Sequence, residues 1–277
     1  MAKEGVTTGM PTNLSILLPV CQHCILGKQM KKTVPKVQQG GRARKLLEVV
    51  YADLTGPEDI ASASGAKYIL NLIDDASGMT WTHLIKEKSQ AEKIFVEWHT
   101  LVENETGQSV KCLRTNNGGE FTSAQFENHL CQCGIQHQMM APYTLAQNGC
   151  VEHKHWTIMD RARAIRADLD LPPNLWGKCV LTSSYMKNRT LSRSMSEKTP
   201  FEAYYGRKLN LSHLRELGCH AFILKQGNNP KIYYQSVECI LIGYSQNSKS
   251  YRCYHWESQW IHTSHDICFI ESQDNMP

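Results

Sequence analysis

Three polar residues stand where a strand or a helix is expected to begin or end. Asp53 closes an apolar run ahead of a Gly-Pro break, Asn116 follows a second apolar run, and Glu152 follows a Gln-Asn-Gly loop at a predicted helix start. Magnesium prefers oxygen ligands in near-octahedral geometry and is usually held through carboxylates. Two such cations can activate the attacking and leaving oxygens of a phosphodiester. Oxygen-bearing side chains at such positions could therefore hold Mg2+ or Mn2+ for phosphoryl-transfer chemistry, if the fold brings them together.

Each of these residues, taken alone, also has a structural interpretation. Asp53 has the position of an ordinary turn or cap residue. Asn117-Gly118-Gly119 is a favourable turn sequence, and Glu152 in a first helical turn would be stabilised by the helix macrodipole. The functional interpretation therefore depends on finding the three positions together, at a spacing that a known family uses.

Hydrophobic patterning predicts the elements that must position these residues. Three runs have the length and β-branched content of strands: Leu46–Asp53, Lys67–Ile73 and Met79–Ile85. The last two are joined by a hairpin turn, whose acids Asp74 and Asp75 we interpret as structural. The strongest helical pattern runs to Gly107 from a capping box formed by Ser89 and Glu92.

The next stretch of chain completes a recognisable order of elements. Four elements are predicted in turn: a strand at Val110–Thr115, a helix opened by a Thr122–Gln125 capping box and closed near Gly134, a strand at Ile135–Met140, and a helix from about Val151. This order is that of an α/β domain with a mixed five-stranded sheet flanked by helices. Cys131 and Cys133 with His137 would span a helix end and a strand, so we do not interpret them as a metal cluster.

The pattern changes to short strands after Leu214. These strands are predicted at Cys219–Lys225, Glu238–Tyr244, Ser250–His255 and Trp260–Ile270. Their spacing suits a small C-terminal antiparallel β-barrel. Two helices are predicted before it, over 172–190 and from Thr199-Pro200 onward.

Two segments resemble the signatures of integrases from copia-type retrotransposons. Residues 113–121 read Leu-Arg-Thr-Asn-Asn-Gly-Gly-Glu-Phe, and residues 141–154 read Ala-Pro-Tyr-Thr-Leu-Ala-Gln-Asn-Gly-Cys-Val-Glu-His-Lys. The resemblance implies a ribonuclease-H-like integrase core over 46–208 and the small β-barrel over 209–277. It assigns Asp53, position 116 and Glu152 to an acidic catalytic triad, with the 35 residues 117–151 between the last two. It also implies that the partners are the DNA ends of the element and target DNA, that the protein forms homo-oligomers, and that it is localised in the nucleus.

Asn116 departs from the family pattern, which has Asp at this position. An amide oxygen can ligate a cation but brings no negative charge to it. We expect the loss of that charge to cost on the order of several kcal/mol of metal affinity and transition-state stabilisation, and about a thousandfold or more in rate. The fold should survive this change, whereas catalysis should be impaired.

Basic residues supply candidate DNA contacts. No acidic residue occurs between Gly5 and Leu47, and this stretch reads as an extended basic linker able to lie along a phosphate backbone. A solvated tether without a ligand is the alternative. In the helix after Glu152, His155 and Trp156 replace the Asn and Arg of the family, which would weaken phosphate contacts. The candidate contacts are Lys31, Lys32, Arg42, Arg44, Lys154 and Arg161.

Cys21 and Cys24 form a Cys-x-x-Cys pair that could supply half of a tetrahedral zinc site. Integrases of the resembled family carry two histidines upstream of such a pair, and residues 1–20 contain none. Residues 1–45 are therefore interpreted as a truncated zinc-type module and basic linker, with an incomplete site for Zn2+.

Composition limits the remaining possibilities. A chain of 277 residues with 41% hydrophobic content can form one substantial core and a smaller module. Its 11 cysteines lack a repeating framework, which indicates reduced thiols inside the cell. No apolar run approaches the ~20 residues of a membrane span, so we expect no membrane association and, apart from the resemblance, a cytoplasmic place. We predict a retrotransposon integrase segment, impaired at Asn116. The alternatives are a non-catalytic DNA-binding or assembly protein and a relic that folds poorly.

Overall fold

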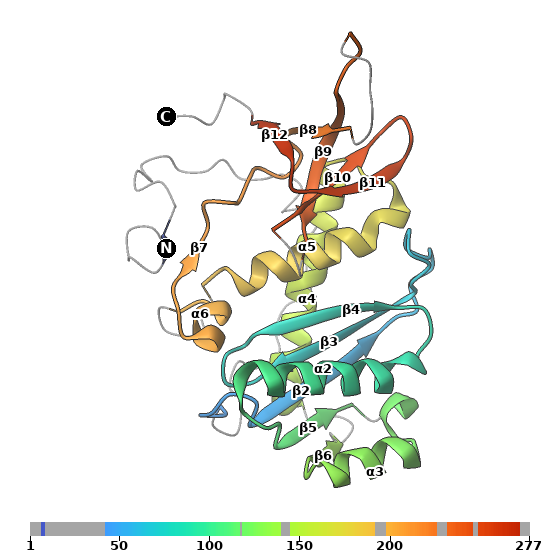
Figure 1. The fold of residues 1–277 in the computed structure, drawn as a ribbon. Helices are drawn as coiled ribbons and strands as arrows, with labels where there is room; N and C mark the ends of the chain where they lie inside the picture. The colour runs from blue at the N-terminus through green and yellow to red at the C-terminus, as the bar shows by residue number, and fades with distance from the viewer. Residues whose placement is uncertain are drawn as a thin grey trace.

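The core of the molecule is a mixed five-stranded β-sheet (Figure 1). The computed structural model describes residues 42–116, 118–139, 145–191, 198–225, 232–245 and 249–271, and of residues 145–154 and β1 (Thr7–Thr8) it describes the backbone only. The strands of the core sheet are β2 (Val49–Thr55), β3 (Tyr68–Asp74), β4 (Thr80–Ile85), β5 (Cys112–Thr115) and β6 (Gln136–Met139). Their order is β4-β3-β2-β5-β6, with β3 antiparallel to its neighbours and β2, β5 and β6 parallel. The predicted mixed sheet is confirmed.

Helices cover both faces of this sheet. The helical elements are α2 (Gln90–Thr106), η1 (Gly119–Phe121), α3 (Ala124–Gln132), α4 (Leu145–Asp168), η2 (Pro173–Leu175), α5 (Trp176–Asn188) and α6 (Pro200–Tyr205). Successive residues of a strand point to opposite faces. Accordingly Val50 and Ala52 pack with Phe95 of α2, whereas Tyr51 lies in a separate cluster. Figure 1 shows α2 in front of the sheet and α4 behind it.

The first core strand begins later than predicted. β2 starts at Val49 rather than Leu46, because Leu47 is fully buried in a left-handed conformation with φ 60°. Its N–H donates to Asp74 Oδ1 at 2.9 Å, and the other oxygen of Asp74 accepts the N–H of Ser77 at 2.7 Å. Asp74 is therefore a buried structural acid, which holds the start of the core against the β3–β4 turn.

The helix caps differ from those predicted. Ser89 makes no side-chain cap bond on α2, and Gln90 Oε1 instead accepts the N–H of Lys86 at 2.8 Å. Ser123, not Thr122, caps α3 by accepting a backbone N–H of its first turn at 3.1 Å. The capping patterns thus located the helix starts to within about two residues but assigned the wrong capping atoms.

The C-terminal module is a five-stranded antiparallel sheet. Its strands are β8 (His220–Leu224), β9 (Ser236–Tyr244), β10 (Tyr251–His255), β11 (Trp260–Ser264) and β12 (Ile267–Ile270), in the order β11-β10-β9-β8-β12. The predicted single strand from Trp260 to Ile270 is two strands. The predicted small antiparallel C-terminal module is confirmed, and among the described residues β11 and β12 stand at the two ends of the strand order. Ahead of this sheet in the sequence, the short strand β7 (Leu209–Asn210) pairs with β1.

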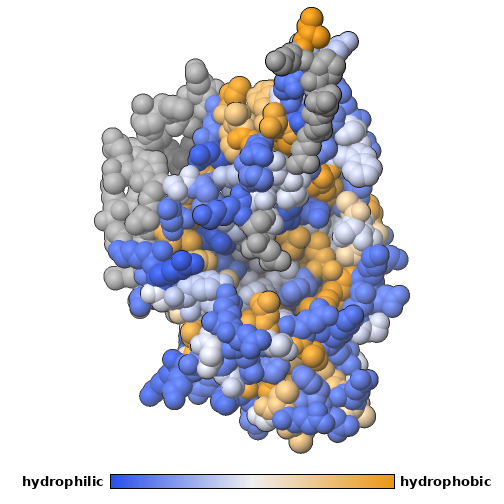
Figure 2. Space-filling model, in the orientation of Figure 1, coloured by the Kyte–Doolittle hydropathy of each residue, from blue (hydrophilic) through white to orange (hydrophobic). Residues whose placement is uncertain are grey.

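Helix α5 lies between the two sheets. Its residues Cys179 and Val180 pack in one buried cluster with Ile69 of β3 and Ile242 of β9. Thr182 Oγ1 donates to the carbonyl of Ile242 at 2.9 Å, and it occupies the space that a Cβ at Gly243 would need. Figure 2 shows hydrophilic residues over most of the visible face, with hydrophobic residues in separate patches among them. No helix in the described part of the chain has the length and apolar character to cross a membrane.

Candidate metal and nucleic-acid site

The strand register brings Asp53 and Asn116 to the same edge of the core sheet. β2 and β5 are parallel, and their last registered pair is Ala52 with Thr115. The next residues along the two strands are Asp53 and Asn116, so the register places them side by side where both strands leave the pairing. Two of the three predicted catalytic positions are therefore neighbours in the structure.

Asp53 is a half-buried carboxylate with a raised pKa. Burial, and next the negative charge of Glu120, raise the pKa of Asp53 above its usual value, with a hydrogen bond from Thr55 acting in the opposite direction. A carboxyl group in this setting gains most from a cation, because a cation offsets both causes of the raised pKa. Such an environment is typical of functional sites.

Glu120 is a residue that the sequence analysis did not assign. It lies in η1, and its carboxylate folds back over Gly118, where a Cβ would collide with it. A glycine at position 118 is thus needed for the carboxylate to take this place. Its electrostatic effect on Asp53 puts a second negative group at the same site. The signal was present in the Gly-Gly-Glu-Phe sequence, but no physical pattern distinguished this Glu from a surface acid.

Asn116 uses its side-chain oxygen within its own loop. Asn116 Oδ1 accepts the N–H of Gly118 at 3.2 Å, and the residue is half-buried. The carbonyl oxygen of an amide has two lone pairs, so one acceptor site remains for a cation. No negative charge accompanies it, as the sequence indicated.

The third position lies in α4, and the expected start of this helix is wrong. α4 begins at Leu145, so Glu152 lies about two turns inside it, and the predicted stabilisation by the N-terminal macrodipole does not apply. The Gln-Asn-Gly stretch is helical and not a loop. The side chain of Glu152 lies outside the described residues. Its backbone position shares a helical face with His155, because residues three apart lie on one side of a helix.

His155 places this face of α4 over the strand that carries Asp53. His155 Nδ1 lies 3.0 Å from Asn71 Nδ2 and 3.5 Å from Thr55 Oγ1. Asn71 is the direct cross-strand partner of Asp53. Residue 152 therefore occupies the helical face that approaches the strand of Asp53. His155 contacts the sheet, whereas the sequence analysis had considered it only as a lost phosphate contact.

The surroundings of His155 favour its neutral form. Burial, and next the charge of Arg163, lower the pKa of His155 below its usual value of 6.5. The amide nitrogen of Asn71 is a donor only, so Nδ1 must act as the acceptor. Asn71 is itself fully buried, and its oxygen accepts the hydroxyl of Thr82 at 2.8 Å. A chain of hydrogen bonds therefore runs from His155 of α4 through Asn71 of β3 to Thr82 of β4.

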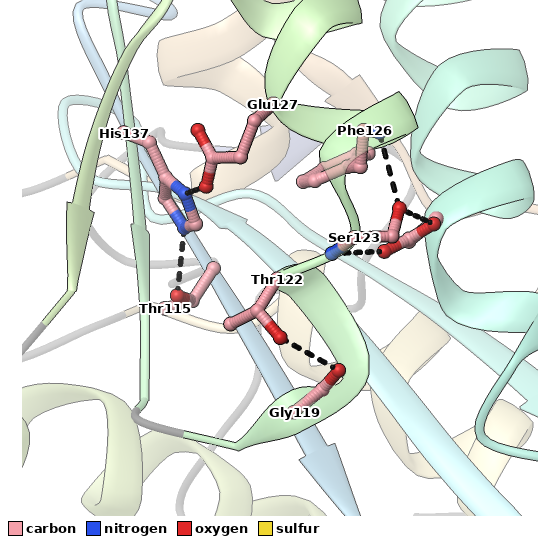
Figure 3. Close-up of polar contacts among 8 residues, drawn as sticks. Thr115, Gly119, Thr122, Ser123, Phe126, Glu127 and His137 are labelled. Carbon is pink, nitrogen blue, oxygen red and sulfur yellow. Dashed lines mark hydrogen bonds and ion pairs between the residues drawn. The ribbon is translucent and has the colours of Figure 1, made fainter.

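The loop after Asn116 is braced on the β6 side by a histidine (Figure 3). His137 Nδ1 lies 2.5 Å from Glu127 Oε1 of α3, and its Nε2 lies 2.9 Å from Thr115 Oγ1 at the end of β5. Both ring nitrogens are therefore engaged. This contact ties the strand end that delivers Asn116 to α3.

A second brace ties the same loop to α2. Glu92 of α2 accepts the hydroxyl of Ser123 at 2.7 Å and the N–H of Ser123 at 3.2 Å. Ser123 in turn caps α3, and Figure 3 shows its hydroxyl between the two helices. Thr122 donates to the carbonyl of Gly119 at 3.1 Å inside the loop. Residues 118–123 are thus fixed at both sides, next to the Asp53 edge.

The predicted DNA contacts have different surroundings. Arg42 Nε donates to the carbonyl of Asp75 at 2.5 Å, so the chain joins the folded core by residue 42 rather than after 45. Arg161 is half-buried, and its Nη1 donates to Thr190 Oγ1 at 3.2 Å. Arg44 is exposed. The remaining predicted residues lie outside the described side chains: Lys31, Lys32, Lys154, Cys21 and Cys24.

Two family models match separate parts of the chain. The integrase core domain matches residues 44–144, and the retroviral polymerase SH3-like domain matches residues 219–276. The first match contains Asp53, Asn116 and Glu120. The second contains all five strands of the C-terminal sheet.

Known relatives extend over nearly the whole chain. The chain is 35% identical over 254 residues to the retrovirus-related Pol polyprotein from transposon TNT 1-94 of Nicotiana tabacum, which covers 91% of this chain and 19% of that protein. It is 27% identical over 266 residues to the one from transposon RE1 of Arabidopsis thaliana, covering 94% and 18%. The chain thus spans about a fifth of the length of these relatives.

A solved structure has a similar fold over most of the chain. It is the cryo-electron-microscopy structure of a simian T-cell lymphotropic virus intasome in complex with the PP2A regulatory subunit B56 gamma. The TM-score is 0.50 at 13% identity, with 89% of this chain and 87% of that chain covered. At this identity the likeness concerns the fold alone.

Proposed function

We propose that this chain carries out, or once carried out, DNA integration for a copia-type retrotransposon. It belongs to the integrase family of retrovirus-related Pol polyproteins. The reaction would be metal-dependent cleavage of phosphodiesters at element ends and strand transfer into target DNA. In the unmodified chain this chemistry is impaired by Asn116. The partners would be DNA and further copies of the chain, and the place of action the nucleus.

The observation that carries the proposal is the charge environment of Asp53. The register sets Asp53 beside position 116, and Glu120 adds a negative charge that helps raise the pKa of Asp53. A site that concentrates negative charge on a half-buried carboxylate is suited to a divalent cation. The oxygen donors fit Mg2+ or Mn2+ in type, since two carboxylates and one amide oxygen belong to described residues.

The residues of the chain would have distinct roles at this site. Asp53 would hold the cation, and Glu152 would complete its ligands from the α4 face that approaches β2. A bound cation supplies charge stabilisation on the phosphate and activation of an attacking oxygen. Asn71 and His155 would position the strand of Asp53 against α4. Asn71 is the cross-strand partner of Asp53, and it bonds to His155 of α4.

Asn116 favours a second candidate function. Its oxygen accepts the Gly118 N–H, and it contributes no charge to the site. A chain that kept the fold and lost cation affinity could still bind DNA through its backbone-contacting basic residues. That candidate is a non-catalytic DNA-binding or assembly protein derived from an integrase.

A strand-transfer assay on short duplex DNA with Mg2+ or Mn2+ tests the proposal. We expect Asn116→Asp to form joined product at least about a thousandfold faster than the unmodified chain, because it restores one of three charges. Asn116→Asp combined with Asp53→Asn is the matched control and should form none.

Each other outcome has a defined meaning. If neither the unmodified chain nor Asn116→Asp forms product but both bind DNA with a steep salt dependence, the second candidate is correct. Equal activity in the two chains would show that the charge at position 116 is not limiting. Failure of both to bind DNA, with a folded chain, would contradict both functions.

A further inference from the structure

A histidine of α2, a histidine of α3 and the cysteine that caps α3 form a cluster on the face of the core sheet opposite Asp53. His99, His129 and Cys133 each offer one ligand atom, and these atoms all lie within 4.8 Å of one another. His129 and Cys133 are four residues apart, so they share one face of α3 and its C-terminal cap. His99 approaches them from the neighbouring helix.

The distance between Cys133 and His129 matches that between two ligands of one zinc ion. Cys133 Sγ lies 3.7 Å from His129 Nε2. Zinc–nitrogen bonds of about 2.1 Å and zinc–sulfur bonds of about 2.3 Å, at a tetrahedral angle, put such a pair of atoms about 3.6 Å apart. Two imidazoles and one thiolate are a ligand set that selects zinc over magnesium or calcium.

His99 is a buried polar side chain without adequate partners. Its side chain is 7% exposed, and neither ring nitrogen makes a hydrogen bond among the described residues. Nε2 lies 3.0 Å from Glu103 Oε1, but the contact is not aligned as a hydrogen bond, and the same oxygen of Glu103 accepts the Val110 N–H at 2.7 Å. Leaving a buried donor or acceptor unpaired costs about 1–3 kcal/mol.

Packing fixes the direction of the His99 ring. Phe95 stacks on it with ring centroids 5.9 Å apart and planes 3° from parallel, and His129 meets it edge-on with centroids also 5.9 Å apart. The ring is therefore set in the α2–α3 interface beside His129. A purely structural histidine in this position would be expected to find a hydrogen-bond partner.

We propose that His99, His129 and Cys133 bind one Zn2+ ion that clamps α2 to α3. Cys133 is exposed, so the fourth position is open to water. The clamp would steady Ser123 and the 118–123 loop, since the same two helices hold that loop through Glu92. The site is separate from the Asp53 edge and does not depend on the proposed function. The sequence analysis had considered Cys133 with His137, which instead bonds to Glu127 and Thr115.

The test is a zinc-binding measurement on the full chain. Cys21→Ser with Cys24→Ser serves as the background, which removes the Cys-x-x-Cys pair that lies outside the described residues. Zinc retained after reconstitution and desalting is counted by inductively coupled plasma mass spectrometry. We expect one equivalent in the background and in the further variant Cys268→Ser, an exposed thiol of β12. Cys133→Ser and His129→Gln, each in this background, should each weaken zinc binding at least about tenfold.

Two spectroscopic and thermal measurements guard against misfolding as the explanation. Cobalt substitution should give a thiolate-to-cobalt charge-transfer band that disappears in Cys133→Ser but persists in Cys268→Ser. Zinc should raise the melting temperature of the background by several degrees and leave that of Cys133→Ser unchanged. No retained zinc in the background, or equal zinc and equal thermal shifts in Cys133→Ser, would overturn the proposal.

Discussion

The two faces of the core sheet are built from different kinds of contact. On the α2 face, Val50, Leu70 and Phe95 belong to one large cluster of buried apolar side chains. On the α4 face, the aligned cross-strand residues Asp53, Asn71 and Thr82 form a polar row. The α2 face thus depends mainly on apolar packing, whereas the α4 face combines buried apolar residues such as Ile69 and Ile73 with this polar row. Substitutions on the two sides should therefore differ in what they change.

The largest expected effect on stability is on the α2 face. Phe95 is fully buried and contacts the rings of Trp98, His99 and Phe126. Phe95→Ala should lower the free energy of unfolding by about 3–5 kcal/mol, because it leaves a cavity in a packed core. Urea unfolding followed by circular dichroism measures this. Leu101→Ala, at a 59% exposed position of the same helix, should change it by less than about 0.5 kcal/mol.

The next effect is on the polar row. Asn71→Ala removes the partner of both His155 and Thr82, so it should lower the free energy of unfolding by about 1–3 kcal/mol. It should also reduce strand transfer in an Asn116→Asp chain, because His155 of α4 loses the shorter of its two contacts with the sheet. A loss of stability with full activity would contradict the positioning role of Asn71. Equal losses from Asn71→Ala and Phe95→Ala would erase the contrast between the faces.

Substitution of Asp53 should stabilise the protein rather than destabilise it. Its pKa is raised by burial and then by Glu120, so below the usual value of 3.8 the folded and unfolded chains both carry the neutral acid. As the pH rises from there to the raised pKa, the unfolded chain loses its proton first and stability falls. Without divalent cations, Asp53→Asn should therefore raise the melting temperature at neutral pH by roughly a few degrees, and hardly at all near about pH 3. The exposed Asp59→Asn is the control.

Substitution of His155 should have the smallest effect on stability, and this effect should appear at acid pH. Its folded pKa is lowered, so stability is intact above the usual value of 6.5 and is lost as the pH falls from there through the lowered pKa. His155→Gln should make the decline in melting temperature between neutral and acid pH shallower by about a degree or two. His265→Gln, whose side chain is 75% exposed, should leave the decline unchanged. An identical decline in both variants would mean that His155 is not held neutral.

Much of the fold followed from sequence patterns because those patterns report local physics. Alternating and continuous apolar runs located every core strand, and the helical spacing of Phe95 and Trp98 located α2. Strand and helix ends were less accurate. Leu47 in a left-handed conformation, for example, delayed β2 because of a bond to Asp74, which is 27 residues away in the chain. Such long-range bonds leave no local pattern.

The site was predictable in part for the same reason. Asp53 and position 116 came from motif spacing, and the parallel register of β2 and β5 then placed them together. Glu120 was missed because its importance depends on a side chain folding back over Gly118. The His99 cluster was missed because His99 lies in α2, and only the fold brings it to His129 and Cys133 at the end of α3.

The position of α5 between the two sheets has a consequence for synthesis of the chain. The side of α5 that faces the C-terminal sheet contacts Ile242 of β9 through the Thr182 bond and a shared apolar cluster. β9 follows α5 in the sequence by dozens of residues. While a ribosome is still adding those residues, that side of the helix faces water or another protein. Domains tend to fold as units during synthesis, and uncovered apolar surface then favours aggregation. Release of chains ended after α6 should therefore give insoluble or chaperone-bound product.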